Sequence, residues 1–375
     1  MSWSEIVAGI EALEPARLDA ALVARTESVG ATDRAISFYT PTFKTYASSE
    51  LSSCGKNAWP AVSITGGNCK LQCDHCKAKV LEPMIPATTP ESLWRVMNEQ
   101  IERGARGMLL TGGSNHRDEV EYGPFLPVVR RLKHRVPSFR IALHTALVDR
   151  DMACAMAEAG VDVAMLDIIG AQDTVSQVYH LRRPVADFER SLEHLVATSM
   201  KVVPHIVIGL HYGRMLGEWQ ALEMIARHRP DALVLVVAMP FYAPANRPFA
   251  TPLSREVGSF FLDARAALPE TPVLLGCARP PGRARIEIDV YAALAGLAGI
   301  AHPADGVVEL ALKLGRDVNV IPACCSIAVG EQVLGFQDPD APRIDPWLVA
   351  QAGKRAPSRI ARIPVVASCG AATSS

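Results

Sequence analysis

The sequence predicts an α/β fold, and within that class a (β/α)8 barrel of the TIM type. Eight short aliphatic or β-branched runs recur along the chain, and each is followed by a segment long enough for a helix. Near-continuous apolar strands that alternate with helices indicate a parallel sheet covered by helices, and 375 residues suffice for one large barrel. The runs occupy residues 61–67, 107–113, 140–146, 161–170, 201–210, 232–240, 271–277 and 299–303.

The segments between these runs carry the signals of amphipathic helices. The first begins at TPESLW, where Thr89 suits the N-cap and Pro90 the first helical position. Residues 149–160 and 185–200 have the same character. A doubly wound open sheet is the competing fold, but no G-x-G-x-x-G or G-x-x-x-x-G-K-[ST] motif supports a nucleotide-binding version of it.

Segments on both sides of the barrel complete the predicted organisation. Residues 1–58 are expected to form a cap of mixed helical and extended structure, residues 59–303 the barrel, and residues 304–375 a C-terminal extension. The extension ends in VASCGAATSS, a tail of small residues that is expected to lack order.

Charge and cysteine content limit the classes of partner and compartment. The net charge of -1, from 38 basic and 39 acidic residues, provides no overall field that would attract nucleic acid or an anionic membrane. The first residues show no signal peptide, and no stretch approaches 18 uncharged apolar residues, so a cytoplasmic protein is expected. Nine cysteines, an odd number, favour metal-binding or catalytic thiols over a disulfide framework.

Three of these cysteines, Cys69, Cys73 and Cys76, lie within eight positions in the stretch NCKLQCDHCK. A four-thiolate zinc site would need a second cysteine pair nearby, and a C-x-x-C-H haem attachment would need histidine where Lys77 stands. A redox C-x-x-C pair would leave Cys69 without a role. A [4Fe-4S] cluster normally takes four thiolates, so three would leave one iron open to bind a reactant.

The spacing C-x3-C-x2-C, in a loop after the first predicted strand, resembles the signature of the radical S-adenosylmethionine (SAM) superfamily. The resemblance covers residues 59–303 and implies that the three cysteines bind a [4Fe-4S] cluster. In this superfamily the open iron binds the amino and carboxylate groups of SAM, and reductive cleavage yields a 5'-deoxyadenosyl radical. His75 stands where the superfamily commonly has an aromatic residue.

Two further segments resemble SAM-binding motifs of the superfamily. The turn after the second predicted strand is similar to the "GGE" motif, whose backbone meets the SAM amino group, although a serine replaces the glutamate. The stretch HIVIG at residues 205–209 is similar to the "GxIxG" segment that packs along adenine. An ordinary βα turn and an aliphatic strand would look much the same. The matching positions are Thr111, Gly112, Gly113 and Ser114 in the first segment, and Ile206 and Gly209 in the second.

Two polar residues end predicted strands on their own. His144 and Asp167 lie at the carboxyl ends of strands, which is the face where barrel enzymes carry their functional groups. Each is a candidate for contact with ribose or substrate, and each has a purely structural alternative.

The remaining cysteines suggest a second cluster. Cys277 ends the seventh predicted strand, Cys324 and Cys325 form an adjacent pair, and Cys54 precedes the first strand. We expect the first three to ligate an auxiliary iron-sulfur cluster, with Cys54 as a possible fourth ligand; packing of small buried thiols is the alternative. Cys154 is expected in a helix core, and Cys369 has no expected role.

A radical SAM barrel with an auxiliary cluster resembles the sulfur-inserting branch, which includes biotin synthase and lipoyl synthase. The stretches FYTPTFKTY, SITGGNCKLQCDHCKAKVLEPMIPA, GCARPPGRARIEIDVYAALAGLAGIAHPA and CCS look like the split, two-protein lipoyl synthases. The N-terminal C-x4-C-x5-C motif of the single-chain lipoyl synthases is absent.

This resemblance implies a substrate and partners. The substrate would be an octanoyl chain on a lysine of a lipoyl carrier protein or domain, and the partners a second related radical SAM protein and an electron donor such as ferredoxin or flavodoxin. Arg279, Arg283 and Arg285 are candidates to meet the carrier or the SAM carboxylate. The alternatives are a radical SAM enzyme that modifies a peptide or cofactor, and a non-catalytic partner that carries a cluster.

Overall fold

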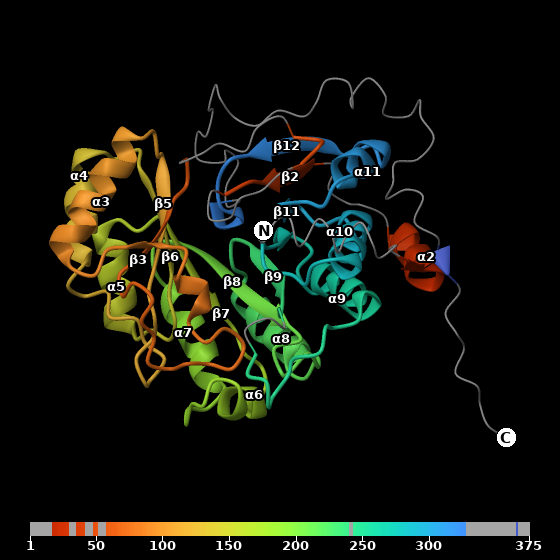
Figure 1. The fold of residues 1–375 in the computed structure, drawn as a ribbon, viewed down its shortest axis with the longest axis horizontal. Helices are drawn as coiled ribbons and strands as arrows, with labels where there is room; N and C mark the ends of the chain where they lie inside the picture. Colours follow the sequence, from red (N-terminus) through yellow and green to blue (C-terminus); the bar gives the residue numbers. More distant parts are fainter. Residues whose placement is uncertain are drawn as a thin grey trace.

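The computed structural model describes residues 17–29, 35–41, 48–51, 58–239, 243–327 and 365–366. Its main feature is one curved parallel sheet of eleven strands, in the order β12-β2-β11-β10-β9-β8-β7-β6-β5-β3-β4 (Figure 1). The strands are β2 (Ala35–Tyr39), β3 (Ala61–Ser63), β4 (Ile85–Pro86), β5 (Gly107–Thr111), β6 (Arg140–His144), β7 (Val163–Asp167), β8 (Lys201–Ile208), β9 (Leu233–Val237), β10 (Val273–Leu275), β11 (Gly299–Ala301) and β12 (Asp317–Ile321). A separate pair joins β1 (Leu18–Asp19) to β13 (Val365–Val366).

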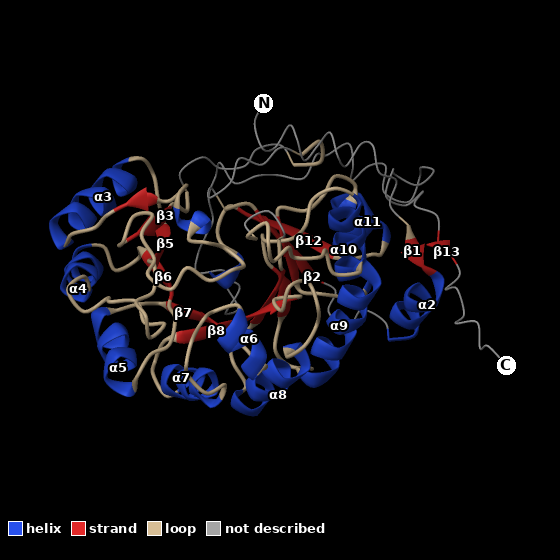
Figure 2. Cartoon of the chain, turned by 60° about the horizontal axis from the view of Figure 1, so that its bottom comes forward, coloured by secondary structure: helices blue, strands red, loops and turns tan. Residues whose placement is uncertain are grey.

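Helices connect successive strands and cover the outer side of the curved sheet, as Figure 2 shows. Such crossovers are what parallel pairing requires. The helices are α2 (Ala20–Val29), α3 (Pro90–Glu102), α4 (Leu126–Arg135), α5 (Arg150–Ala159), α6 (Gln172–Gln177), α7 (Ala186–Val196), α8 (Glu218–His228), α9 (Ser254–Ala267), α10 (Arg283–Leu294) and α11 (Val307–Lys313), with 3-10 turns η1 (Lys79–Leu81) and η3 (Cys325–Ile327).

The predicted α/β class and the parallel, barrel-type sheet are confirmed. The eight predicted strands are β3 and β5 to β11, and they pair in chain order. The sheet is an open half-barrel, because its order ends at β12 and β4 and no pairing between these two is found among the described residues. Strands β2 and β12, which the sequence reading missed, extend the sheet beyond β11.

Strands β2 and β12 come from the segments expected to flank the barrel, whereas β4, which was also not predicted, lies within it. β2 lies between β11 and β12 and pairs in parallel with both. The division at residues 58 and 303 stays a prediction, but both flanking segments contribute to one sheet. No helix in the described ranges combines the length and the apolarity needed to cross a bilayer.

Two hydrophobic cores lie on the two sides of the sheet. Alternate residues of a strand face opposite sides, so one set packs against the helices and the other faces the concave side. The concave set forms a core of its own with the segment after β12, which we call the inner core. Its buried members are Tyr39, Trp59, Ala142, Val163, Met165, Val203, Ala232, Val234, Leu274, Ala301, Ile321, Ala323, Cys325 and Ile327.

Local signals set the helix ends as the sequence predicts. Thr89 caps α3 by accepting a hydrogen bond from the Ser92 backbone N–H at 3.1 Å, and Ser92 accepts one from Thr89 in return. Asp149 caps α5 by accepting a hydrogen bond from the Met152 backbone N–H. The expectation that Cys154 belongs to the helix core is wrong, because α5 buries Ala153 and Met156 and turns Cys154 to solvent.

Candidate functional site

The predicted site residues follow the carboxyl ends of parallel strands, which meet at one edge of the sheet. The loop with Cys69, Cys73 and Cys76 follows β3, and the turn with Gly113 follows β5. His144 and Asp167 end β6 and β7. The cysteine loop, the glycine turn and the polar strand ends therefore follow neighbouring strands at this edge of the sheet, as the sequence predicts. We call this edge the mouth.

The cysteine loop, residues 69–78, is held in a compact chain of turns. The backbone N–H groups of Cys76 and Lys77 donate to the Cys73 carbonyl at 3.3 and 2.9 Å. The Gln72 side chain donates to the Cys69 carbonyl at 2.7 Å. All three cysteines are free thiols; Cys73 is buried and the other two are half-buried. The loop thus presents three thiols on a short, folded segment.

The glycine turn packs directly against this loop. A Cβ on Gly113 would come within 2.0 Å of the Asn68 carbonyl oxygen and 2.6 Å of Cys69. The Gly113 N–H donates to Thr65 Oγ1 at 2.7 Å, and the Ser114 carbonyl accepts from the Lys70 N–H at 2.9 Å. Only glycine allows this approach, which gives the "GGE"-like segment a steric role independent of any bound molecule.

The other residues of this turn make structural contacts. The Thr111 hydroxyl donates to the His144 carbonyl at 3.0 Å, within the sheet. A Cβ on Gly112 would lie 2.8 Å from Ile64 Cγ1. The Ser114 side chain hydrogen-bonds with Asp118, so serine holds a neighbouring carboxyl group where the motif has glutamate.

Burial and charge separate the reactivities of the thiols. Burial raises the pKa of Cys73 well above its usual range, and repulsion by Cys76 adds to this. Burial also opposes ionisation of Cys76, but the charge and hydrogen bond of His75 outweigh it and lower the pKa of that thiol. The His75 ring lies 5.1 Å from the Tyr179 ring, centroid to centroid, and its Nδ1 has no hydrogen-bond partner in the described part of the chain.

A cluster of carboxyl and imidazole groups lies beside the thiols. His144 Nε2 is 3.7 Å from Asp167 Oδ1, and both side chains are about 30% exposed. The ring of His205 on β8 lies 5.2 Å from the His144 ring, and burial lowers the pKa of His205 to about 4. Burial raises the pKa of Asp118 to about 6. His205 is therefore neutral at physiological pH, and the accessible groups are His144 and Asp167.

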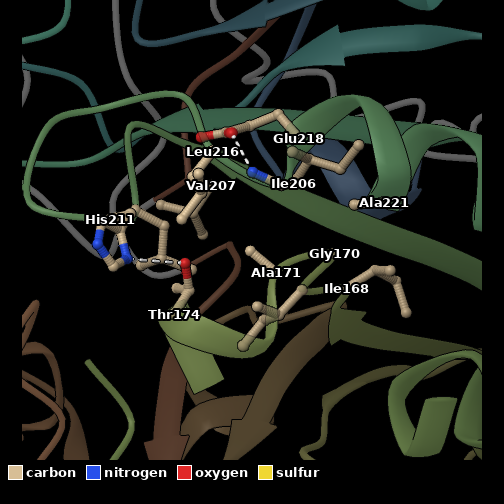
Figure 3. Close-up of a pocket in the computed structure, with 13 residues that line it drawn as sticks. Ile168, Gly170, Ala171, Thr174, Ile206, Val207, His211, Leu216, Glu218 and Ala221 are labelled. Atoms are coloured by element: carbon tan, nitrogen blue, oxygen red, sulfur yellow. Dashed lines mark hydrogen bonds between the residues drawn. The ribbon is translucent and has the colours of Figure 1, made fainter. Parts of the chain in front are cut away.

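The β8 segment that resembles "GxIxG" borders a pocket (Figure 3). The pocket encloses about 240 Å³ of space open to solvent, between the segments that follow β7 and β8. Ile206 lines it while packing in the core between sheet and helices. Thr174 Oγ1 and His211 Nδ1, which both line the pocket, form a hydrogen bond of 3.1 Å.

Gly209 shapes the end of this strand. Its φ of +77° is in the region that favours glycine, and a Cβ would meet Pro252 at 2.3 Å. Its N–H donates to Glu218 Oε1 at 2.7 Å, so the first residue of α8 fixes the turn. Ile206 and Gly209 therefore have structural contacts at the pocket, and their role toward adenine stays a prediction.

The second group of cysteines gathers at the inner core. Cys277 follows β10, and Cys324 and Cys325 follow β12; Cys325 is buried and the other two are half-buried. The Cys325 thiol donates a hydrogen bond to Cys324, which lowers the pKa of Cys324, and Cys325 is also close enough to Cys277 for repulsion between them. Cys54 and Cys369 lie outside the described residues.

The arginines after Cys277 are not a free basic surface. Arg279 is 5% exposed and forms a bidentate ion pair with the buried Asp289. It also donates to the Gly276 and His302 carbonyls at 2.6 and 2.8 Å. The expectation that Arg279 meets a carrier or the SAM carboxylate is corrected, because its charge is already neutralised in the core. Arg283, at 3.5 Å from Glu287, remains half exposed.

The donor set at the mouth fits an iron-sulfur cluster. Three free thiols on one loop, one with its pKa lowered, are the donors that such clusters use, and the loop that carries them packs closely against Gly113. No three His, Cys, Asp or Glu side chains in the described ranges converge to hold a single metal ion.

Sequence reasoning missed several residues around the thiols. Asp118 and Tyr179 come from segments far apart in the chain, and no motif marks them; His205 begins the stretch HIVIG, but its place beside His144 becomes visible only in the fold. Asp74 lies inside the cysteine motif, but its side-chain partners become visible only in the fold.

Comparison with known proteins supports this geometry. Residues 63–225 match the model of the radical SAM superfamily. No curated protein matches the chain at a significant level. The structure resembles methylornithine synthase (PylB), with a TM-score of 0.50 at 13% identity over 79% of this chain and 81% of that one. It equally resembles HydG, a maturase of the [FeFe]-hydrogenase, with a TM-score of 0.50 at 13% identity over 80% and 67%. These two likenesses show a shared fold.

Proposed function

We propose that this protein, whose residues 63–225 form a radical SAM superfamily domain, inserts sulfur into an octanoyl chain on a lysine of a lipoyl carrier protein or domain. The domain itself implies an enzyme that uses a [4Fe-4S] cluster and SAM. The sulfur insertion is the finer step, and sulfide from an auxiliary cluster would supply the sulfur. A second related radical SAM protein and a ferredoxin- or flavodoxin-type donor complete the proposed system.

Residues at the mouth have distinct parts in this proposal. Cys69, Cys73 and Cys76 would hold the cluster, which supplies the electron that cleaves the sulfonium of SAM when bound. Gly113 allows the cysteine loop to pack against the turn after β5, because a side chain there would collide with Asn68 and Cys69. His144 and Asp167, each about 30% exposed at the ends of two neighbouring strands, would orient a polar group of SAM or substrate.

One observation supports the sulfur-insertion step of the proposed function. It is a second set of thiols at the same edge of the sheet. Cys277 and Cys325 follow two strands that are separated in the sheet by β11 and β2, yet Cys325 is buried in the inner core and Cys277 packs against that same core. A soft, partly exposed thiol group is the donor set that iron-sulfur clusters select. The exposed side chain of Val80, next to the cysteine loop, adds an apolar surface suited to an acyl chain.

The first experiment counts clusters. After anaerobic reconstitution, iron and acid-labile sulfide are measured on the wild type, on the Cys69/Cys73/Cys76 triple alanine variant and on the Cys277/Cys324/Cys325 triple alanine variant. Each triple variant is expected to keep about four irons and the wild type about eight. Cys154→Ala, an exposed cysteine of α5, is the matched control and should keep all of its iron. Loss of all iron in the first triple variant would contradict a second cluster.

The second experiment tests the reaction. The reconstituted protein, with its clusters labelled with ³⁴S, is incubated with SAM, a reductant, the partner protein and an octanoyl-lysyl carrier peptide. We expect 5'-deoxyadenosine and a peptide that has gained ³⁴S. Deoxyadenosine with no gain of sulfur by this peptide would favour another peptide- or cofactor-modifying enzyme. Absence of deoxyadenosine under all conditions would indicate a non-catalytic cluster carrier.

A further inference from the structure

Asp74 is a buried carboxylate inside the cysteine loop, between Cys73 and Cys76. Its side chain is 4% exposed, so it has little access to water. A buried carboxylate is tolerated only when other groups satisfy its charge and its oxygen atoms. The contacts of Asp74 therefore show what the cysteine loop is attached to.

Three side chains from three different segments donate to Asp74. Lys77, in the loop itself, places Nζ 2.6 Å from Oδ1. His180, after α6, places Nε2 3.0 Å from Oδ1, and Tyr212, after β8, places its hydroxyl 2.9 Å from Oδ2. The Asp74 N–H also donates to the Val178 carbonyl at 2.8 Å. Backbone and side chain together tie the loop to the segments that follow β7 and β8.

The backbone of the same region is strained. Gln72, Lys77 and Ala78 of the loop all have positive φ, between 46° and 60°. His180 and Tyr212, two of the groups that bind Asp74, have φ of 58° and 54°. Non-glycine residues in this region are unfavourable by roughly 1 kcal/mol or more each, and they persist when the surrounding contacts fix them. The hydrogen bonds of Asp74 are among the contacts that do so, together with the bonds within the loop.

These contacts also connect the loop to the pocket. Tyr212 directly follows His211, which lines the pocket and pairs with Thr174. The hydroxyl of Tyr212 also contacts the carbonyl of Gln177 in α6 at 2.9 Å. Arg247, from the segment before α9, lies 3.3 Å from the Tyr212 hydroxyl and 3.7 Å from Asp74. The contacts of Asp74 thus connect the cysteine loop to the segments that line the pocket.

We propose that Asp74 is a positioning residue that holds the cysteine loop in its ligating shape before any metal binds, and couples that loop to the walls of the pocket. The inference rests on the cluster site at Cys69, Cys73 and Cys76, and it is independent of the proposed sulfur insertion. Asp74 touches no reacting atom. Its effect is exerted through the loop that carries Cys73 and Cys76.

The direct test uses metal-free protein. Hydrogen–deuterium exchange is measured over residues 69–79, 174–181 and 209–213 in the wild type, Asp74→Asn and Asp74→Ala. Loss of the charge-assisted bonds should speed exchange in all three segments by about tenfold. Asp151→Asn, an exposed aspartate on α5, is the control and should leave them unchanged. Wild-type exchange rates in both Asp74 variants would overturn the proposal.

A second arm separates positioning from a general loss of stability. Tyr212→Phe removes one of the three bonds without changing the loop sequence, and it should speed exchange over residues 69–79 with no change in the thermal unfolding midpoint. After reconstitution, Asp74→Asn should lose iron to a chelator about tenfold faster than the wild type, and Asp74→Glu should restore part of the difference. Equal rates of iron loss in wild type and Asp74→Asn would also contradict the proposal. None of these measurements depends on octanoyl substrate or sulfur transfer.

Discussion

At the scale of single residues, the contact between Gly113 and the cysteine loop is the most sterically restrictive feature of the mouth. The space that a side chain would need is filled by the Asn68 carbonyl and by Cys69 itself. Gly67 lies just before the cysteine loop. It has no heavy atom within 4 Å of a Cβ position and no positive φ. The two glycines therefore form a matched pair, one constrained and one free.

Gly113→Ala is expected to displace the loop and lower cluster assembly by about tenfold, since contacts of 2.0 and 2.6 Å with backbone atoms cannot be relieved by a side-chain rotation. The measurement is iron bound per chain after reconstitution under limiting iron. Gly67→Ala should match the wild type. Equal iron contents in the two variants would show that the loop does not need the close approach.

At the scale of elements, helix α11 is held by a residue from a distant segment. Glu50 accepts hydrogen bonds from the N–H groups of Gly306, Val308 and Glu309 at 2.7, 3.3 and 2.8 Å. These donors have no partner within the helix, so the carboxylate acts as its cap. Burial outweighs these bonds and raises the pKa of Glu50 to about 7.

The raised pKa predicts a pH dependence of stability. The folded protein holds the Glu50 proton more tightly than the unfolded chain, so this stabilisation is complete below the unfolded pKa, near 4.5, and is lost as pH rises through about 7. The wild type should gain up to about 3 kcal/mol between pH 8 and pH 5 from this group. Glu50→Gln should flatten that part of the curve, measured by urea unfolding. Glu27→Gln, at an exposed position of α2, should keep it, and a curve for Glu50→Gln that follows the wild type would contradict the assignment.

At the scale of the whole molecule, the inner core joins the two flanking segments to the barrel. It combines Tyr39 from β2, Trp59 before β3, and Ile321 and Ile327 from the C-terminal segment. The same segment places Cys325 in this core, against which Cys277 also packs. Stability of the barrel and assembly of the second thiol group therefore depend on one set of long-range contacts.

Ile327→Ala is expected to destabilise the whole domain by roughly 2 to 4 kcal/mol, because Ile327 is fully buried and its truncation leaves a cavity in the inner core. Denaturant unfolding followed by tryptophan fluorescence suits the measurement, since Trp59 lies in this core. Leu314→Ala, at an exposed position, should change stability by less than about 0.5 kcal/mol. If the C-terminal segment were an independent unit, the midpoint of the fluorescence transition would stay at the wild-type value.

Features that depend on neighbouring residues were predictable from the sequence. The eight strands, the capping of α3 by Thr89 and the three-thiol loop all arise from periodicity or spacing within a short window. Features that depend on which side of a helix faces the core, or on side-chain partners, were less predictable from the sequence. The sequence pattern predicts Cys154 in a core, although its helix turns it outward, and makes Arg279 a candidate to meet the carrier or SAM, although it forms a buried ion pair with Asp289.

The sequence by itself determined the parallel α/β architecture and the thiol loop with its glycine turn, because strand and helix patterns and ligand spacing are local properties of the chain. Only the tertiary structure decided that β2 and β12 extend the sheet, that Cys277 and Cys325 share the inner core, and that Asp74 binds His180 and Tyr212. Those contacts join residues far apart in the chain, and their free energy comes from burying apolar surface and from the hydrogen bonds that satisfy buried charges. No short stretch of sequence contains that information.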